Sequence, residues 1–304
     1  MSEHITPPFD SEISLDSIII NAQKAVNSTL SMPPRSSSLI NAPVFVVGCP
    51  RSGTTVLGRC LGAHTKCVTA EESLVMLPLW KIYIDLYAQG LPTGVAHLSE
   101  YLDNNELVDA LGNFSDSVFN GLLTKNNKEI YVDHTPWYGV ISPFIQGLND
   151  ARFIHIVRDG RQVVHSLTSS YLKGYTWAGK SMEERINIWR QVTLSTDRFL
   201  KECDTNVYTV YYNDLCKRPE EVLKGVSSFL GISYETDTIL PLEIPHASSD
   251  KNAPFGKSAI YKNYSSNGWP YIWKEEERQL FRFHGGEAMD ILFGLDWDKS
   301  KGII

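Results

Sequence analysis

One loop in the sequence combines a single cation with hydroxyl and glycine residues, directly after an apolar run. The run is Val44-Phe45-Val46-Val47, and the loop that follows it, residues 48–55, reads G-C-P-R-S-G-T-T. A loop of this kind between a strand and a helix presents backbone N–H groups and a helix N-terminus to an anion. The pattern therefore predicts a site for a phosphate or a similar anion.

The cation of this loop does not stand where a nucleoside triphosphate site has it. The frame G-x-x-x-x-G matches a Walker A loop, but Thr54 occupies the position of its Lys, and the cation is Arg51 instead. A transferred phosphoryl group is normally held by Mg²⁺ together with that Lys. A sulfuryl group carries less charge, so one Arg with backbone donors and hydroxyls is sufficient without a metal. The loop favours a phosphosulfate over a triphosphate; the alternative is an ordinary tight turn with an incidental Arg.

A second charged turn follows a later apolar run, residues 153–157. It reads Arg158-Asp159-Gly160-Arg161, and Ser166 lies eight residues past Arg158. Because ligands of open α/β sheets bind outside the carboxyl ends of the strands, this turn and the first loop are expected to face one crevice. A plain surface turn is the alternative interpretation. Asp159 also resembles a Walker B aspartate, which keeps a nucleotide hydrolase under consideration.

Two residues are candidates for the general base that an acceptor hydroxyl needs. The first is Glu72 in A-E-E-S (residues 70–73), where the chain returns after the first helix. Carboxylates are also common at a solvated helix start, which is the alternative. The second is His134 in D-H-T-P (residues 133–136), at the end of a short strand. Neutral His can act as a base and charged His as an electrostatic group, whereas a structural imidazole is the alternative.

Strands and helices alternate along the chain, and this alternation must position the candidate residues. Short apolar runs rich in β-formers predict strands, and longer segments of helical periodicity predict helices. The alternation is typical of a three-layer α/β sandwich with a central parallel sheet. Residues 1–40 are expected to form a lead-in helix and linker, and residues 41–304 a single domain. The expected strands are 44–47, 130–132, 153–157 and 207–211, and the expected helices are 55–61, 77–89, 105–123, 138–148, 161–172, 182–203, 219–230 and 274–292.

Composition excludes several classes of protein. The 304 residues carry a net charge of −7 and no run of Lys and Arg, which argues against nucleic acid as a partner. No apolar stretch approaches the roughly 18 residues of a membrane span, and the first residues lack the cations of a secretory signal. We therefore expect a cytoplasmic protein with no membrane partner. The five cysteines have no zinc-ligand spacing, so no metal is expected; they are Cys49, Cys60, Cys67, Cys203 and Cys216.

The two charged loops, found in this order, resemble the hallmarks of PAPS-dependent sulfotransferases (PAPS is 3′-phosphoadenosine-5′-phosphosulfate). The branch with a Pro-Arg-Ser-Gly-Thr-Thr loop is the most similar one, as in tyrosylprotein and bacterial sulfotransferases. The resemblance implies a P-loop NTPase-like fold and the use of PAPS without a metal. It further implies that five residues of the first loop hold the 5′-phosphosulfate: Arg51, Ser52, Gly53, Thr54 and Thr55.

The same resemblance assigns further roles. Arg158 and Ser166 would bind the 3′-phosphate, and Glu72 would be the base. His134 stands where the family commonly has the Lys of Glu-Lys-Thr-Pro, so the division of labour between Glu72 and His134 stays open. Tyr212 of Tyr-Asn-Asp-Leu would approach the nucleotide. One Lys of the later loop would cap the 3′-phosphate, with Lys262 preferred over Lys251 and Lys257.

The expected activity is transfer of a sulfuryl group from PAPS to a hydroxyl or amine of a small-molecule or carbohydrate acceptor, giving PAP. A P-loop phosphotransferase or hydrolase using ATP and Mg²⁺ is one alternative, and a catalytically inert nucleotide-binding protein is another. The acceptor pocket is expected from residues 73–125, 170–182 and 232–268. Aromatic residues in the first two segments suggest a partly apolar or ring-bearing acceptor: Trp80, Tyr83, Tyr87, Tyr171, Tyr175 and Trp177.

Overall fold

The computed structural model describes residues 40–88, 101–202, 206–243, 273–294 and Trp297. The predicted lead-in of residues 1–40 falls almost wholly outside these ranges, so the predicted division at residue 40 stays a prediction. Within the described residues, no helix has both the length and the apolarity needed to cross a bilayer.

Five parallel strands form one central sheet in the order β2-β3-β1-β4-β5. The predicted strands are confirmed, and β2 is a fifth strand that the sequence analysis missed because it has only three residues. In chain order the strands are β1 (Val44–Val47), β2 (Cys67–Thr69), β3 (Ile130–Asp133), β4 (Arg152–Val157) and β5 (Asn206–Tyr211).

The central strand β1 is buried on both faces, as its unbroken apolar run predicts. Side chains alternate along a strand, so Phe45 and Val47 enter one hydrophobic core while Val44 and Val46 enter the other. The register places Phe45 beside Phe153 of β4. The sheet is therefore the middle of three layers, which confirms the predicted fold class.

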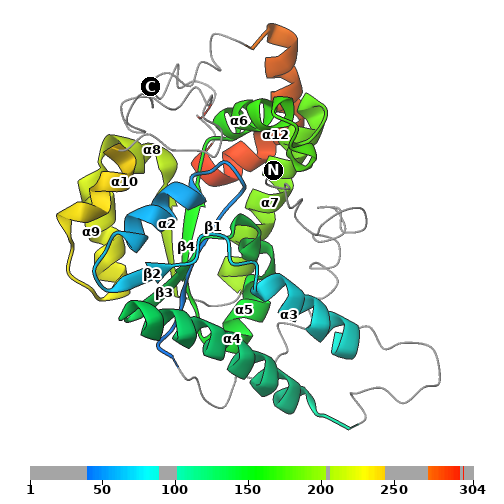
Figure 1. Ribbon diagram of the computed structural model, residues 1–304. Helices are drawn as coiled ribbons and strands as arrows, with labels where there is room; N and C mark the ends of the chain where they lie inside the picture. The colour runs from blue at the N-terminus through cyan, green and yellow to red at the C-terminus, as the bar shows by residue number, and fades with distance from the viewer. Residues whose placement is uncertain (1–39, 89–100, 203–205, 244–272, 295–296, 298–304) are drawn as a thin grey trace, which may run out of the picture.

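One outer layer packs through the core that contains Val44 and Val46. It lies on the left of the sheet in Figure 1. Its helices are α2 (Thr54–Gly62), α8 (Tyr212–Lys217), α9 (Pro219–Leu230), the 3₁₀ turn η5 (Thr236–Ile239) and α10 (Leu240–Glu243).

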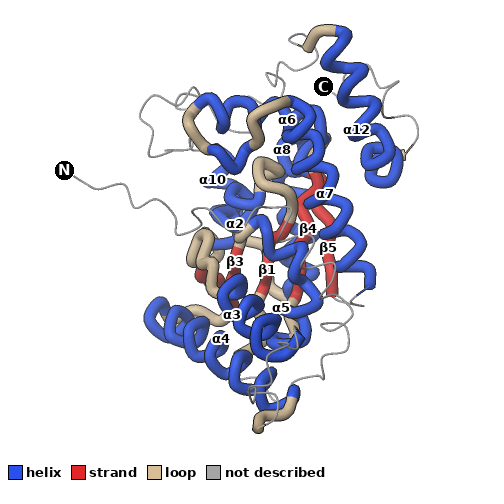
Figure 2. The backbone as a smooth tube through the Cα atoms, turned by 90° about the vertical axis from the view of Figure 1, so that its right-hand side faces the viewer, coloured by secondary structure: helices blue, strands red, loops and turns tan. Residues whose placement is uncertain are grey.

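The other outer layer is larger and covers the face that contains Phe45 and Val47. Figure 2 shows α3, α4 and α5 of this layer in front of the strands. Its helices are α3 (Met76–Tyr83), the π-helical turn η1 (Ile84–Ala88), α4 (Asn104–Asn126), the 3₁₀ helix η3 (Pro136–Ile141), α5 (Ser142–Asn149), α6 (Gly160–Leu172), the 3₁₀ turn η4 (Thr176–Ala178), α7 (Met182–Glu202) and α12 (Glu275–Phe293).

The predicted helix over residues 138–148 is two elements instead of one. The chain runs through η3 and restarts as α5, with Pro143 in its first turn. Proline has no N–H to donate to the preceding turn and clashes with it, but it fits the first turn of a new helix.

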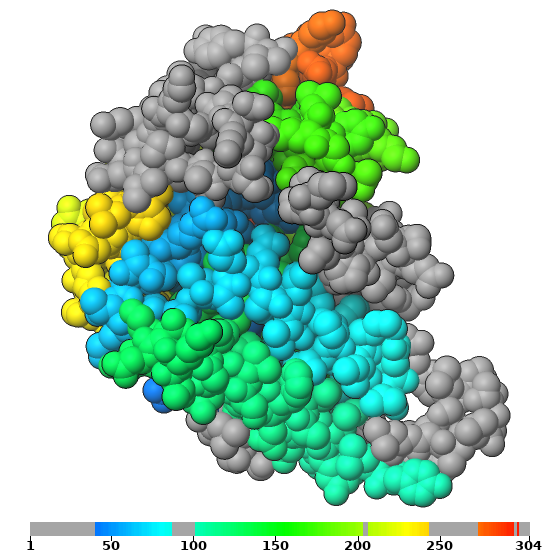
Figure 3. Space-filling view, in the orientation of Figure 1, coloured from blue at the N-terminus to red at the C-terminus, as the bar shows by residue number. Residues whose placement is uncertain are grey.

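The space-filling view shows how the elements are arranged on one face of the molecule. The blue-to-cyan segment from α2 to α3 occupies the middle of this face, with α4 below it and α6 above (Figure 3).

Candidate active site

The loops after β1 and β4 begin at neighbouring points of one sheet edge. β1 lies between β3 and β4, and all three strands run in the same direction. From β1 the chain crosses through α2 to β2 on one side of the sheet, whereas β4 and β5 lie on the other side. Such a reversal of strand order opens a crevice at the carboxyl ends of the strands. The strand order thus brings the two predicted loops to the same edge of the sheet.

The loop between β1 and α2 takes a backbone shape that suits anion binding. Gly53 has φ 106° and precedes α2 as its N-cap residue. It provides no side-chain cap, so the first-turn N–H groups of α2 can donate hydrogen bonds to a ligand. A Cβ atom at Gly53 would lie 2.6 Å from Cδ2 of Tyr212, so the Tyr212 ring packs directly on this glycine. Ser52 and Thr54 are buried, whereas Arg51, with φ 73°, is exposed.

Arg158 at the end of β4 holds this loop from the other side. Its Nη1 donates to the carbonyl oxygen of Arg51 at 2.8 Å, and its Nε donates to Oε1 of Gln162 at 3.0 Å. The guanidinium carbon lies 4.1 Å from the centre of the Tyr212 ring. Arg158 is therefore buried at the site and oriented by three neighbours. Gln162, in the first turn of α6, was not among the predicted site residues.

Arg51 and Ser166 meet directly. Nε of Arg51 donates to Oγ of Ser166 at 3.0 Å, although 115 positions separate the two residues. Although Arg51 as a whole residue is exposed, the protein packed around its guanidinium and the nearby charge of Arg158 lower its pKa, while Tyr212, Tyr175 and Glu72 act in the opposite direction. The residues predicted to hold opposite phosphates of one nucleotide thus form a single cluster.

Glu72 belongs to the loop that follows β2, and this loop has an unusual backbone. Its neighbours Glu71 and Leu74 have φ values of 51° and 57°, in the left-handed region that costs free energy for residues other than glycine. Glu72 is exposed, yet the protein around its carboxyl raises its pKa, and the charges of Asp133 and Glu71 raise it further. The charge of Arg51 opposes them. The Glu72 carboxyl therefore lies within electrostatic range of the Arg51 guanidinium.

His134 occupies a different setting from Glu72. Its side chain is fully buried, and its ring lies so close to Gly58 of α2 that a Cβ atom there would overlap it. Neither ring nitrogen has a hydrogen-bond partner among the described residues. Burial lowers the pKa of His134, and the charges of Asp133 and Glu71 only partly offset this. Burial therefore favours the neutral form of the imidazole, which packs against α2, while the His134 backbone N–H donates to the carbonyl oxygen of Glu71 at 3.4 Å.

The carboxylate of Asp159, the residue that resembled a Walker B aspartate, makes its hydrogen bonds to Arg161 in the first turn of α6. Its Oδ1 accepts from the Arg161 backbone N–H at 2.9 Å, which caps α6. Its Oδ2 accepts from Nη2 of Arg161 at 2.6 Å, and both side chains are buried. The Arg-Asp-x-Arg turn is thus held together by an internal ion pair between Asp159 and Arg161.

Of the remaining predicted ligand residues, one lies beside the first loop and the others fall outside the described residues. Thr55 stands in the first turn of α2, next to the loop. Lys251, Lys257 and Lys262 all lie outside the described residues. Tyr175 is one of the aromatic residues predicted on the acceptor side. Its effect on the pKa of Arg51 places it near the cluster of Arg51, Arg158 and Ser166.

Comparisons with known proteins show the family to which the chain belongs. The family model described as "Sulfotransferase family" matches residues 43–236, more than half of the chain. A Caenorhabditis briggsae protein named as a protein-tyrosine sulfotransferase is 24% identical over 227 residues, which cover 72% of this chain and 76% of that protein. Protein-tyrosine sulfotransferase 2 of Gallus gallus is 24% identical over 204 residues, covering 65% of this chain and 53% of that protein. The chain thus spans about half the length of the second relative.

Solved structures share the fold. The sulfotransferase domain of the Synechococcus PCC 7002 olefin synthase superposes with a TM-score of 0.54 at 18% identity, covering 82% of this chain and 96% of that domain. At this identity the likeness speaks for the architecture of sheet and helices.

Proposed function

The chain belongs to the sulfotransferase family, and from that premise we propose that it transfers a sulfuryl group from PAPS to a hydroxyl or amine of a small-molecule or carbohydrate acceptor, giving PAP. The hydrogen bond from Arg158 to the carbonyl oxygen of Arg51, at 2.8 Å, is the observation that carries the proposal. It joins the cationic ends of β1 and β4 in one cluster, as the binding of both phosphate groups of a single nucleotide requires.

The donor would be held by backbone and side chains of both loops. Five residues of the first loop would bind the 5′-phosphosulfate, and the adjoining guanidinium of Arg158 with the Ser166 hydroxyl would bind the 3′-phosphate. Tyr212 would contact the nucleotide from the Gly53 side. Anions are favoured here because α2 begins without a side-chain cap and because two guanidinium groups lie close together. The five residues of the first loop are Arg51, Ser52, Gly53, Thr54 and Thr55.

The reaction would be an in-line displacement at sulfur. The acceptor oxygen or nitrogen forms a bond to sulfur while the bond from sulfur to the 5′-phosphate oxygen breaks. The electron pair of the broken bond goes to that phosphate oxygen, and the acceptor proton goes to a protein base. Arg51 would stabilise the charge that develops on the leaving phosphate, because a guanidinium donates charge-assisted hydrogen bonds to such oxygens. This role accounts for an exposed Arg within a loop whose other residues are buried or partly buried.

Glu72 suits the role of base better than His134 does. Its carboxyl is open to solvent and near Arg51, and its raised pKa makes it a stronger base than an ordinary carboxylate. The His134 ring has no exposed surface and a lowered pKa, so an acceptor would reach it only if α2 moved. We therefore propose Glu72 as the base and a supporting place for His134 beneath the loop.

The acceptor side carries exposed aromatic rings. Tyr175 and Trp177 are 52% and 43% exposed, and their ring centres are 5.9 Å apart on the connection between α6 and α7. Exposed rings beside a reaction centre favour acceptors with a flat apolar face, either an aromatic ring or the apolar face of a sugar. The names of the relatives add a tyrosine phenol to the acceptors that deserve a test.

Thermal stabilisation by nucleotides tests the donor. PAP alone is expected to raise the melting temperature, while ATP with Mg²⁺ is expected to raise it little. Stabilisation by ATP only in the presence of Mg²⁺, with none by PAP, would favour the phosphotransferase or hydrolase alternative. Radiolabelled PAPS offered with phenols, amines, sugars and tyrosine peptides then identifies the acceptor. Binding of PAP without transfer to any acceptor or to water would support the inert alternative.

A further inference from the structure

The carboxylate of Asp133 is fully buried at the end of β3, and four donors converge on it. Its Oδ1 accepts from the backbone N–H of Thr135 at 2.9 Å and from the Thr135 hydroxyl at 2.7 Å. Its Oδ2 accepts from the Tyr131 hydroxyl at 2.9 Å and from the Ser73 hydroxyl. Burial of a carboxylate costs free energy, and these hydrogen bonds offset the cost. An Asn side chain offers only one acceptor oxygen, so it would leave donors without partners.

One of the four donors comes from the loop that carries Glu72. Tyr131 and Thr135 belong to β3 and the turn after it, whereas Ser73 lies 60 positions away in the chain and directly follows Glu72. The residue before Glu72 is fixed as well. The Glu71 carboxylate accepts from Nη2 of Arg59 at 2.9 Å. Glu72 is thus held between two anchored neighbours, while its own carboxylate makes no hydrogen bond within the described residues.

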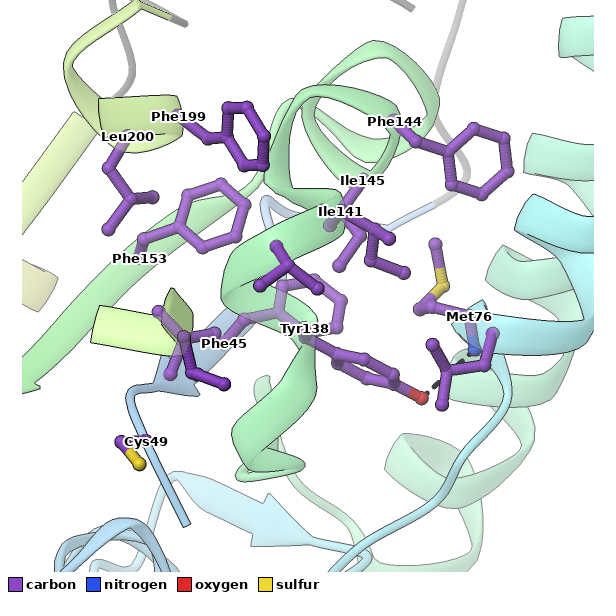
Figure 4. Close-up of a cluster of buried hydrophobic side chains, with 14 of the residues drawn as sticks. Phe45, Cys49, Met76, Tyr138, Ile141, Phe144, Ile145, Phe153, Phe199 and Leu200 are labelled. Atoms are coloured by element: carbon purple, nitrogen blue, oxygen red, sulfur yellow. Dashed lines mark hydrogen bonds between the residues drawn. The ribbon is translucent and has the colours of Figure 1, made fainter. Parts of the chain in front are cut away.

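The loop needs such anchors because of its backbone. Glu71 and Leu74 flank Glu72 and Ser73, and both have a left-handed φ that the surrounding structure must maintain. A second hydrogen bond supports the far end of the loop, where the Met76 N–H donates to the Tyr138 hydroxyl at 2.9 Å (Figure 4). This bond fixes the start of α3, and the bond from Ser73 to Asp133 fixes the residue next to Glu72.

We propose that Asp133 is a positioning residue for sulfuryl transfer, which rests on the proposed role of Glu72 as base: its buried carboxylate holds Ser73 and thereby aims Glu72 at the cation of the first loop. The electrostatics agree. The charge of Asp133 acts together with burial and with Glu71 to raise the pKa of Glu72, against the opposing charge of Arg51. The same carboxylate therefore both places the Glu72 carboxyl and makes it more basic.

Two single-hydroxyl deletions test the positioning. Ser73→Ala and Tyr131→Phe each remove one donor to Oδ2 of Asp133, but only Ser73 lies on the loop. With PAPS and the acceptor found in the screen, Ser73→Ala is expected to lower kcat roughly tenfold to a hundredfold, since misplacement of about 1 Å has costs of that order. Its affinity for PAP should stay unchanged, and the amides of residues 70–75 should exchange hydrogen faster. Tyr131→Phe should lower kcat much less, because Tyr131 does not belong to the loop that carries Glu72. Equal kcat values for the two variants would overturn the proposal.

The pH profile tests the charge. Asp133→Asn removes a negative charge near Glu72, so the pKa of Glu72 should fall and the acid limb of kcat/KM should move to lower pH. Ser73→Ala keeps that charge, so its limb should move less. An acid limb that stays in place in Asp133→Asn would contradict the electrostatic part of the proposal. If Asp133→Asn does not fold, the comparison of Ser73→Ala with Tyr131→Phe decides alone.

Measurement of Glu72→Gln beside these variants separates a failure of Glu72 as the base from a failure of Asp133 as the positioning residue. Full turnover in Glu72→Gln would remove the proposed base and with it the premise. Loss of turnover in Glu72→Gln, combined with unchanged kcat in Ser73→Ala, would leave the base in place and reject only the positioning role of Asp133.

Discussion

Arg158 at the end of β4 donates a hydrogen bond of 2.8 Å to the carbonyl oxygen of Arg51, in the loop after β1. The bond leaves the Arg51 side chain available, and its Nε donates to Ser166 on α6. One arginine thus holds the backbone of the loop whose own arginine is exposed. Mutation of each arginine can therefore test its role separately: donor binding for Arg158 and the chemical step for Arg51.

Removal of Arg158 should weaken donor binding more than catalysis. Arg158→Ala is expected to reduce the affinity for PAP roughly tenfold to a hundredfold, because hydrogen bonds to charged groups contribute about 1.5–3 kcal/mol. Isothermal titration with PAP measures the change. Arg198→Ala is the matched control, because it removes an exposed guanidinium on α7. PAP affinities that are equal in the two variants would contradict the role of Arg158.

Removal of Arg51 should affect the chemical step. Arg51→Ala is expected to lower kcat by roughly a hundredfold to a thousandfold, as for the loss of one group that stabilises developing charge. Arg51→Lys keeps the charge and should recover part of the rate. Both variants meet the same left-handed backbone at φ 73°, so backbone strain cancels in the comparison. Steady-state kinetics with PAPS decide; a Lys variant no better than the Ala variant would mean that the charge is not what matters.

Glu72→Gln should slow turnover and spare donor binding. General base catalysis contributes roughly a hundredfold to ten-thousandfold, so kcat should fall by that order while PAP affinity stays constant. Glu129→Gln is the control, because that exposed carboxylate is paired with Lys66 and does not belong to the Glu72 loop. A fall in kcat that is equally large in Glu129→Gln would argue against Glu72 as the base.

The raised pKa of Glu72 sets the direction of the pH dependence. The base must be deprotonated, so activity rises with pH through the pKa of Glu72, and this limb should lie above the usual carboxyl range. In Glu72→Gln the same limb should disappear from the profile of kcat/KM. A limb that persists unchanged in that variant would assign the titration to another group.

The contact between α2 and His134 should be sensitive to a single methyl group. Gly58→Ala is expected to destabilise the protein by about 1–3 kcal/mol through overpacking against the imidazole. Gly121→Ala on α4 is the control: it meets no atom within 4 Å and should stabilise by about 0.5–1 kcal/mol through helix propensity. Denaturant unfolding measures both. The double variant Gly58→Ala/His134→Ala should recover part of the loss, and no recovery would place the clash elsewhere.

Much of the fold follows from local patterns in the sequence. The run of four apolar residues at Val44–Val47 became the central strand, and the helix at Pro219–Leu230 has the predicted bounds, since a proline opens it and Gly231 follows it. The strand β2 was missed because three residues, of which only Cys67 is buried, give no periodic signal. The break at Pro143 was missed because the apolar periodicity runs across it.

The sequence by itself determined which candidate functional groups are present. They are a cationic, glycine-bracketed loop after one strand, a second cationic turn after another strand, and a pair of glutamates between them. Neighbouring residues suffice for such patterns, because backbone conformation and side-chain periodicity are local properties. Only the tertiary structure decided that Arg51 meets Ser166, that His134 lies buried under Gly58, and that Asp133 holds Ser73. Those contacts join residues far apart in the chain, and the order of the strands and the packing of helices on them decide which distant residues meet.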